Sequence, residues 1–494
     1  MVPLQPIRTF PLNQFKSRAL PCVFLLDYDY SALLLATLPR LQQAFGTTRF
    51  DPDPERHMKN RIQSLIHLTI FSMIGTAWIS QTSAQENWPQ WRGGDLRSIS
   101  SELNLPVKFD KDTNLAWRFP LPGTAGSSPV VWEDRVFVTS ADDDNMVLYC
   151  VGTDGKQQWK KLLDGKNTDS RDNANSASPS PSTDGEHVWC MMGDGIIYCF
   201  TVDGELVWKK DLQQEYGKFN IQFGMSTTPI LDNGNLYVAL MHGNMRDTKT
   251  TSVGQVIAFD AKTGNEIWLH LRKTDGVAEN THSYASPTIY RDKNREFLVT
   301  HGADYVIGHS LEDGAELWRC GGFNPKGQGY NNYLRFVASP GCGEGIIVVP
   351  TAKRKSMAAL KVDIAGNVTE DKSAFHWKLE RGTPDVSTPL IYDGLVYLAG
   401  EKGDLAVHDA KTGKLHYRER LLIDKQRATP VAANGKIYFN GRDGTVVVIK
   451  AGETLEILAE NKLNEELTSS PAMSNGVIYI RTFEAIYAFK NDSE

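Results

Sequence analysis

The sequence predicts an all-β fold, an eight-bladed β-propeller of four-stranded antiparallel blades. A step of small residues into proline, followed by a short apolar strand, recurs every 41 to 58 residues. The prolines of this step are Pro129, Pro179, Pro229, Pro287, Pro340, Pro389, Pro430 and Pro471. Self-similarity at this period, built from several short strands per repeat, is typical of propeller blades.

Residues 128–163 illustrate one blade. Pro129 opens the first strand, at a position where no ladder N–H is lost. Asp154-Gly155 joins the last two strands, because Asp-Gly suits the positive φ of a tight hairpin turn. The four expected strands cover residues 128–132, 136–140, 146–151 and 157–162. The other repeats follow the same order of strands and turns.

A large aromatic residue recurs on the expected outer strand of the blades. In four repeats this residue is a tryptophan that follows a turn glycine by four residues, as Trp159 follows Gly155. Flat rings at one repeated position pack between blades, where a single sheet cannot cover its own face. This structural role is favoured over a ligand cage. The series comprises Trp117, Trp159, Trp208, Trp268, Trp318, Trp377 and Tyr417.

The eighth repeat is one strand short, because the chain ends soon after its third strand at Phe489. Residues 114–119 precede the first blade and carry Trp117 at the outer-strand position. We expect this N-terminal strand to pair with the C-terminal strands and close the ring. Closure also removes exposed sheet edges.

The N-terminal region predicts export. Residues 1–57 form an upstream extension, and residues 58–84 combine a basic start, an apolar run and small residues before the expected cleavage site. We expect a signal peptide that starts at Met58 and a periplasmic or extracellular protein without an integral membrane segment. The rival interpretation is an uncleaved anchor, since the apolar run of about 18 residues approaches the length of a span.

The exported chain divides into three parts. An N-terminal segment covers residues 85–113 and contains a Trp-Pro-Gln-Trp-Arg-Gly motif. The propeller covers residues 114–490, and residues 491–494 form a tail.

Charge and cysteine content narrow the classes of function. The net charge of −6 and the interspersed acidic and basic residues argue against nucleic acid as a partner. Removal of the leader leaves five cysteines, an odd number that requires at least one free or intermolecular thiol. The pairing among them stays open: Cys150, Cys190, Cys199, Cys320 and Cys342. No Cys-x-x-Cys motif supports a zinc ribbon or attached haem.

Residues 259–268, Phe-Asp-Ala-Lys-Thr-Gly-Asn-Glu-Ile-Trp, resemble the tryptophan-docking repeat of pyrroloquinoline-quinone (PQQ)-like propellers. Residues 87–93 resemble the opening motif of exported members of this superfamily, and the resemblance covers about residues 87–490. It implies the propeller fold. It leaves two classes of function, because the superfamily includes quinoprotein alcohol and glucose dehydrogenases, which use PQQ and calcium, and a cofactor-free lipoprotein that assists outer-membrane barrel assembly.

Departures from both classes limit the transfer of function. The sequence lacks the adjacent cysteine pair that many quinoprotein alcohol dehydrogenases hold against the quinone, and no calcium-binding set can be aligned. It also lacks the cysteine of a mature lipoprotein N-terminus, since Ala84-Gln85 stands at the expected junction. No catalytic residue and no metal site are therefore assigned.

Function is expected in the loops that join strand four to the next strand one, together with the loops between strands two and three. These loops gather on one face of a propeller, the funnel face. Tyrosines there could stack a planar ligand, and arginines could meet carboxylates through paired donors. The alternative is that these are ordinary solvated loops. The funnel candidates are His282, Tyr284, Tyr330, Asn332, Tyr333, Arg335 and Arg427.

The sequence thus favours a binding or protein-interaction scaffold, with a protein or a small anionic or planar ligand in the funnel. The alternative is a PQQ- and calcium-dependent quinoprotein dehydrogenase that oxidises an alcohol or a sugar.

Overall fold

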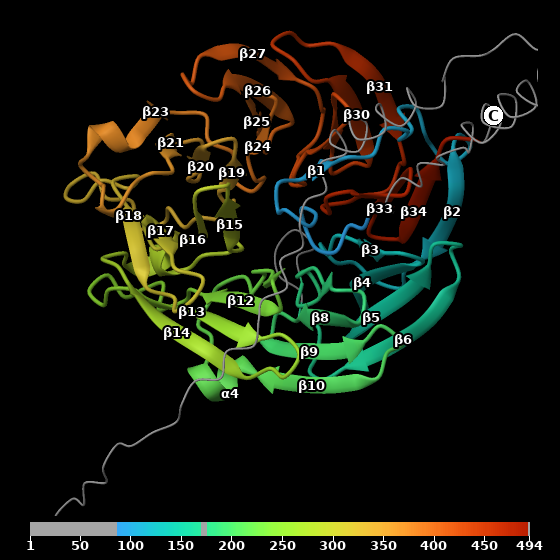
Figure 1. Cartoon of the computed structure of the whole chain (residues 1–494), viewed down its shortest axis with the longest axis horizontal. Helices are drawn as coiled ribbons and strands as arrows, with labels where there is room; N and C mark the ends of the chain where they lie inside the picture. Colours follow the sequence, from blue (N-terminus) through green and yellow to red (C-terminus); the bar gives the residue numbers. More distant parts are fainter. Residues whose placement is uncertain (1–85, 169–174, 493–494) are drawn as a thin grey trace, which may run out of the picture. The chain divides into compact units, whose positions relative to one another are not determined.

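The computed structural model describes residues 86–168 and 175–492. These residues form eight sheets arranged as a ring, which confirms the predicted eight-bladed propeller (Figure 1). The expected extension (residues 1–57) and signal peptide (residues 58–84) lie outside the described residues.

Blades 1 to 4 each contain four antiparallel strands. Blade 1 comprises β3 (Val130–Trp132), β4 (Arg135–Asp142), β5 (Asn145–Gly152) and β6 (Gln157–Leu163). Blade 2 comprises β7 (Ser182–Thr183), β8 (His187–Met191), β9 (Ile196–Thr201) and β10 (Leu206–Asp211). Blade 3 comprises β11 (Ile230–Asp232), β12 (Asn235–Leu240), β13 (Val253–Asp260) and β14 (Glu266–Lys273). Blade 4 comprises β15 (Thr288–Arg291), β16 (Glu296–Gly302), β17 (Tyr305–His309) and β18 (Glu316–Cys320).

Blades 5 to 8 repeat this arrangement. Blade 5 comprises β19 (Gly341–Gly343), β20 (Ile346–Val349), β21 (Met357–Lys361) and β23 (Phe375–Leu379). Blade 6 comprises β24 (Leu390–Tyr392), β25 (Leu395–Ala399), β26 (Asp404–Asp409) and β27 (Leu415–Arg420). Blade 7 comprises β28 (Val431–Ala433), β29 (Lys436–Asn440), β30 (Thr445–Lys450) and β31 (Ile457–Lys462). Blade 8 comprises β32 (Ala472–Ser474), β33 (Val477–Arg481), β34 (Ala485–Lys490) and β2 (Leu115–Pro120).

Blade 8 confirms the predicted closure of the ring. β2 pairs antiparallel with β34, from Leu115 opposite Phe489 to Pro120 opposite Ala485 (Figure 1). Two short parallel strands extend other blades: β1 (Ile99–Ser100) joins β28, and β22 (Gly366–Asn367) joins β18. The helical pieces are short: α4 (Leu212–Tyr216) and the 3-10 turns η2 (Ala278–Thr281) and η3 (Lys372–Ala374). No helix among the described residues has the length and apolarity to cross a membrane.

The core lies between neighbouring blades. Met191 of blade 2 packs in one cluster with Val238 of blade 3, and Val348 of blade 5 packs with Val396 of blade 6. A single twisted sheet cannot bury its own faces, so each blade depends on its neighbours for hydrophobic stabilisation.

The outer-strand tryptophans dock onto the next blade. Trp159 donates its indole N–H to Val202 O at 2.9 Å, and Trp268 donates to Leu311 O at 3.1 Å. Blade 5 has an insertion, residues 362–374, in place of the tight turn of its repeat. Trp318 therefore packs edge-on against Phe297 of its own blade, and its indole N–H has no partner.

A belt of hydroxyl groups joins the inner ends of the blades. In seven of the eight blade junctions, the backbone N–H of the Ser or Thr before a strand-one proline donates to the hydroxyl of its equivalent in the next blade. The acceptors are Ser180, Thr228, Ser286, Ser339, Thr429, Ser470 and Ser128, at 2.9 to 3.3 Å. Thr388 at the remaining junction has a hydroxyl without a partner.

This belt corrects one repeat position. Ser180 takes part in the belt and β7 begins at Ser182, so Pro181 is the strand-one proline of blade 2. The prediction from Pro179 was two residues too early. Both prolines follow a serine, and only the contacts across blades distinguish them.

The N-terminal segment crosses the middle of the ring (Figure 1). Trp88 forms two backbone hydrogen bonds with Val131 of blade 1, both of 2.8 Å. Gln90 exchanges side-chain hydrogen bonds with the backbone of Leu231 in blade 3. Arg92 is buried and donates to Pro340 O and Pro287 O, at 3.4 and 3.2 Å. The motif at residues 87–93 therefore fastens several blades together at the axis.

Candidate functional site

The two kinds of funnel loop meet in the structure. Lys326, in the loop from blade 4 to blade 5, lies 2.9 Å from Asp304 Oδ2 in the loop between β16 and β17. Arg442, in the loop between β29 and β30, lies 3.4 Å from Glu466 in the loop from blade 7 to blade 8. The hollows among these loops include a channel on the axis and a cleft over blades 4 to 6.

The axial channel is small and lined by hydroxyl groups. Its volume is about 170 Å³, and most members of the hydroxyl belt line it, together with Trp91, Tyr284 and Arg427. Trp91 donates its indole N–H to Ser470 Oγ at 3.4 Å. Because each belt hydroxyl already accepts a backbone N–H, its O–H can donate into the channel. The channel is thus a donor-rich site whose wall also includes two aromatic residues and one arginine.

The channel does not fit the PQQ and calcium that the resemblance implies for a dehydrogenase. Calcium requires several oxygen ligands, normally including carboxylates, and no Asp or Glu of the described residues lines the channel. Its volume is also below the range of about 300–1,000 Å³ that is usual for organic ligands. A quinone with a calcium ion therefore finds neither ligands nor space there.

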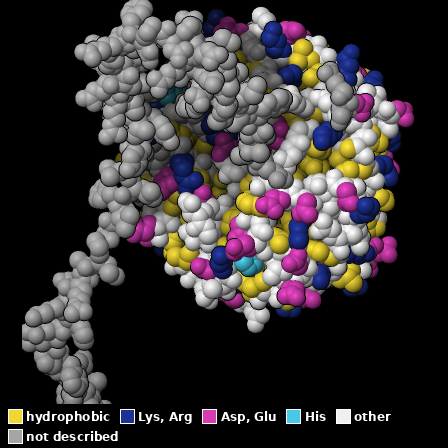
Figure 2. All heavy atoms as spheres, turned by 45° about the vertical axis from the view of Figure 1, so that its right-hand side comes forward, with side chains coloured by type: hydrophobic (Ala, Val, Ile, Leu, Met, Phe, Trp, Pro, Cys, Tyr) yellow, Lys and Arg dark blue, Asp and Glu magenta, His cyan; other side chains and the backbone are white. Residues whose placement is uncertain are grey.

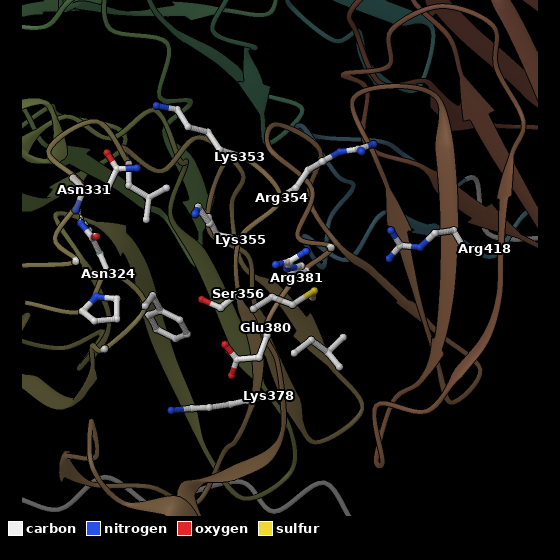
Figure 3. Close-up of a pocket in the computed structure, with 18 residues that line it drawn as sticks. Asn324, Asn331, Lys353, Arg354, Lys355, Ser356, Lys378, Glu380, Arg381 and Arg418 are labelled. Carbon is white, nitrogen blue, oxygen red and sulfur yellow. Dashed lines mark hydrogen bonds between the residues drawn. The ribbon is translucent and has the colours of Figure 1, made fainter.

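The larger hollow, which we call the cationic cleft, has a volume of about 830 Å³. Its walls are the loop from blade 4 to blade 5, the loop between β20 and β21, the end of β23 with the residues after it, and β27 of blade 6. Six cations and one carboxylate, Glu380, line the cleft (Figure 3). The cations are Lys353, Arg354, Lys355, Lys378, Arg381 and Arg418.

The cations of the cleft differ in their partners. Asp404 lies 2.9 Å from Arg354 and 3.8 Å from Arg418. Lys353 donates to the carbonyl oxygen of Tyr333. Lys378 lies 3.8 Å from the ring centroid of Phe375.

Lys355 and Arg381 are exposed, and their side chains have no ion-pair or hydrogen-bond partner among the described residues. The cleft therefore holds a local excess of positive charge.

The backbone holds the cationic loop in place. Gly382 N–H donates to Arg354 O at 3.2 Å, and Thr383 N–H donates to Lys355 O at 3.4 Å. Lys353 and Arg354 both adopt left-handed φ angles, of 53° and 59°. Such angles cost of order 1 kcal/mol for residues with a Cβ, so the surrounding contacts impose this shape.

Three of the funnel candidates serve internal contacts. His282 is 1% exposed and its ring nitrogen lies 2.8 Å from Gly243 O; burial lowers its pKa below the ordinary value. Tyr330 donates its hydroxyl to Asp304 at 2.5 Å and so fixes the loop from blade 4 to blade 5. Tyr284 is 8% exposed and lines the axial channel, and burial raises its pKa to about 12.

Of the other four candidates, Arg335 lies near Tyr284, with its guanidinium carbon 5.9 Å from the centroid of the Tyr284 ring. Arg335 pairs with Glu279 at 2.5 Å and lies over the ring of Phe223. Arg427 lies 3.7 Å from Glu401, beside the axial channel. Tyr333 is exposed, and Asn332 is half-buried. The structure brings Tyr284 and Arg427 to one channel and gathers none of the seven in the cationic cleft.

The cleft includes cations that the sequence analysis missed. The sequence places Lys353 and Arg354 in a loop between strands two and three on the funnel face, but the adjacent Lys355, which completes the run, was not predicted. Arg381 and Arg418 carry no such signal, because they are isolated in sequence and come together only through the packing of blades 5 and 6.

One group of metal-ligating side chains lies at the turn between β7 and β8: Asp184, Glu186 and His187. Asp184 accepts the backbone N–H groups of Glu186 and His187, and Glu186 pairs with Lys262 at 3.1 Å. These contacts give the group a structural role.

Comparisons with known proteins agree with this fold. The profile of a family described as outer membrane protein assembly factor BamB matches residues 98–179, 153–321 and 304–493. A search of curated proteins finds no significant match.

Solved structures with the same fold include a BamB protein and two dehydrogenases. BamB from Moraxella catarrhalis has a TM-score of 0.56 at 11% identity, covering 76% of this chain and 99% of that chain. Quinohemoprotein alcohol dehydrogenase from Comamonas testosteroni has a TM-score of 0.59 at 13% sequence identity, and the match covers 83% of this chain and 81% of that chain. A europium-containing methanol dehydrogenase has a TM-score of 0.59 at 11% sequence identity, and the match covers 81% of this chain and 90% of that chain. At these identities the likeness shows the fold alone.

Proposed function

This chain belongs to the family described as outer membrane protein assembly factor BamB, and we propose that it is an exported, non-catalytic scaffold that binds a partner through its funnel face. The observation that carries the proposal is the cationic cleft. Two of its six cations, Lys355 and Arg381, have no ion-pair or hydrogen-bond partner for their side chains within residues 86–168 and 175–492, and such an excess gives no stability to an isolated monomer. Exposed charges of one sign gathered in a hollow are suited to attract a partner of opposite charge.

Export is part of the proposal. We infer that the signal peptide at residues 58–84 is removed and that the mature protein is periplasmic or extracellular, with residues 85–113 and 114–490 folding together. The contacts of Trp88, Gln90 and Arg92 with the propeller support this, since residues directly after the expected junction are built into the fold. N-terminal sequencing of the secreted protein tests it, and a retained residue 58–84 segment would contradict it.

The composition of the axial channel argues against the dehydrogenase alternative. The test is to mix mature protein with PQQ and calcium, and to measure the quinone absorbance and dye-linked oxidation of alcohols and sugars. We expect no saturable shift of absorbance and no turnover. Saturable binding with turnover would overturn the scaffold proposal.

A further inference from the structure

The cationic cleft has a chemistry that selects one kind of ligand. We propose that it binds an extended, acidic peptide segment of a partner protein that also carries apolar side chains. This assignment deepens the proposed scaffold function and rests on it. Three features of the cleft support it: its unpaired charges, its apolar floor and its length.

The charges select carboxylates. Arg381 offers a planar pair of donors that matches a carboxylate, and Lys355 adds a compact charge on the neighbouring loop. Glu380 is the one carboxylate that lines the cleft within the described chain, so these cations are not neutralised internally. An acidic ligand supplies the missing anions.

The floor selects an amphipathic ligand rather than a simple ion. Between the charged walls the lining includes the exposed Pro325 and the half-buried Leu379, which lie with the buried Phe323, Leu334 and Met357. An inorganic anion would gain nothing from these side chains, whereas a peptide with alternating acidic and apolar residues can place one set on each surface.

The distribution of the cations selects an extended ligand. Figure 3 shows Lys378 toward one end of the cleft and Lys353 and Arg354 toward the other, so the donors do not converge on one point. A smaller hollow of about 260 Å³ shares Lys353, Arg354 and Arg418 with the cleft and continues it toward blade 6. Its lining also includes Asp385, Glu401 and Asp404, so the excess of positive charge is greatest in the cleft itself. A segment of polypeptide can follow this path, but a single phosphate group cannot contact both ends.

Nucleic acids and membranes fit less well. The chain carries a net charge of −6, and the face drawn in Figure 2 mixes both signs of charge. Both of those partners require a broad basic surface, because their phosphate groups repel acidic residues around the contact. The cleft is a local concentration of positive charge on a surface of mixed sign, as recognition of one narrow segment requires.

The test uses the mature full chain and a fluorescent peptide of alternating Glu and Leu, with the Gln-for-Glu peptide as the neutral counterpart. We expect the acidic peptide to bind about tenfold more tightly than the Gln-for-Glu peptide, and its affinity to fall as the salt concentration rises. The double variant Lys355→Glu/Arg381→Glu should lose about tenfold in affinity, or about 1.4 kcal/mol. Both residues are exposed and unpaired, so circular dichroism and thermal unfolding should stay unchanged.

Lys293→Glu is the matched control. Lys293 is an exposed cation in the turn between β15 and β16, on the face opposite the funnel loops, and its reversal should not alter binding. Equal binding of the two peptides, or an undiminished affinity of the double variant, would overturn the assignment. Inorganic pyrophosphate or anionic phospholipid vesicles that bind more tightly than the peptide, with the same sensitivity to the double variant, would also overturn it. None of these results would change the outcome of the PQQ and calcium test, so the peptide ligand and the scaffold function are tested separately.

Discussion

Trp117 of blade 8 lies directly over Gly155 of blade 1. A Cβ atom on Gly155 would lie 2.7 Å from Trp117 Cγ, and the Trp117 indole N–H donates to Thr153 O at 2.7 Å. The same docking recurs at Trp208 over Gly264 and at Trp377 over Gly413. The turn glycine, at a φ of +82°, thus satisfies two requirements: the left-handed turn and the space for the neighbouring ring. At this junction the contact joins the two ends of the propeller.

We expect Trp117→Ala to open the junction between blades 8 and 1. Loss of this half-buried aromatic ring and its hydrogen bond should lower the free energy of unfolding, by less than the roughly 3–5 kcal/mol that truncation of a fully buried aromatic costs. Urea unfolding of the mature chain measures this change, and limited proteolysis should release fragments near β2. A Trp117→Ala protein as stable as the wild type would show that the ring does not depend on this contact.

The hydroxyl belt allows an isosteric test. Thr228 accepts Ser180 N–H at 3.2 Å, whereas the Thr388 hydroxyl, equally buried, has no partner. Thr228→Val leaves a buried N–H unsatisfied and should cost about 1–3 kcal/mol, while Thr388→Val should cost nothing or stabilise the protein. Thermal unfolding of the two variants compares them directly, and equal losses would contradict a stabilising role for the belt.

Glu465 links the loop after blade 7 to the ring closure. It accepts hydrogen bonds from Tyr487 at 2.5 Å and Thr482 at 2.7 Å, and it pairs with Lys111 at 2.9 Å. Burial alone raises its pKa, but these donors outweigh burial and hold the pKa below the ordinary 4.5. A lowered pKa in the folded state contributes stability above pH 4.5, and this contribution is lost as the pH falls through the folded pKa.

Glu465→Gln should therefore destabilise the protein by about 1–3 kcal/mol at neutral pH. The difference from the wild type should shrink at pH values below about 4. Urea unfolding across a pH series measures it, with Glu484→Gln as the control because Glu484 is exposed. A difference that does not change with pH would exclude a carboxylate contribution at this position.

The five cysteines of the described chain are free and buried. Burial raises the pKa of the Cys150 thiol to about 12 and also raises that of Cys342 to about 12. Thiols in this state react slowly, because the thiolate is the reactive form. We expect a thiol-reactive dye to label fewer than one group per folded mature chain and all five in urea. Rapid labelling of the folded protein would contradict the buried, reduced state.

Most of the fold could be predicted because its signals are local. The proline steps and the Asp-Gly turns act within a few residues and recur in order, so they define the blades without knowledge of the packing. The closure by Trp117 followed from counting strands. The position of blade 2 was less certain, since Ser178-Pro179 and Ser180-Pro181 are equivalent locally and only the Ser128–Ser180 hydrogen bond across two blades separates them.

The candidate site could be predicted only in part, because it depends on contacts between residues that are distant in sequence. The loops that form the funnel were identifiable, but the partners of their side chains were not. The Tyr330 hydroxyl donates a hydrogen bond to Asp304, and Arg335 forms an ion pair with Glu279. In each case the partner belongs to another loop.

The sequence by itself determined the number of blades, their internal order and the closure of the ring, because each depends on short-range patterns that repeat. Only the tertiary structure decided which cations meet and which lack an anion. Lys355, Arg381 and Arg418 come from three separate segments, and their shared cleft exists because blades 5 and 6 pack side by side. Whether a charge is neutralised depends on neighbours that are distant in sequence, and that is information no local pattern contains.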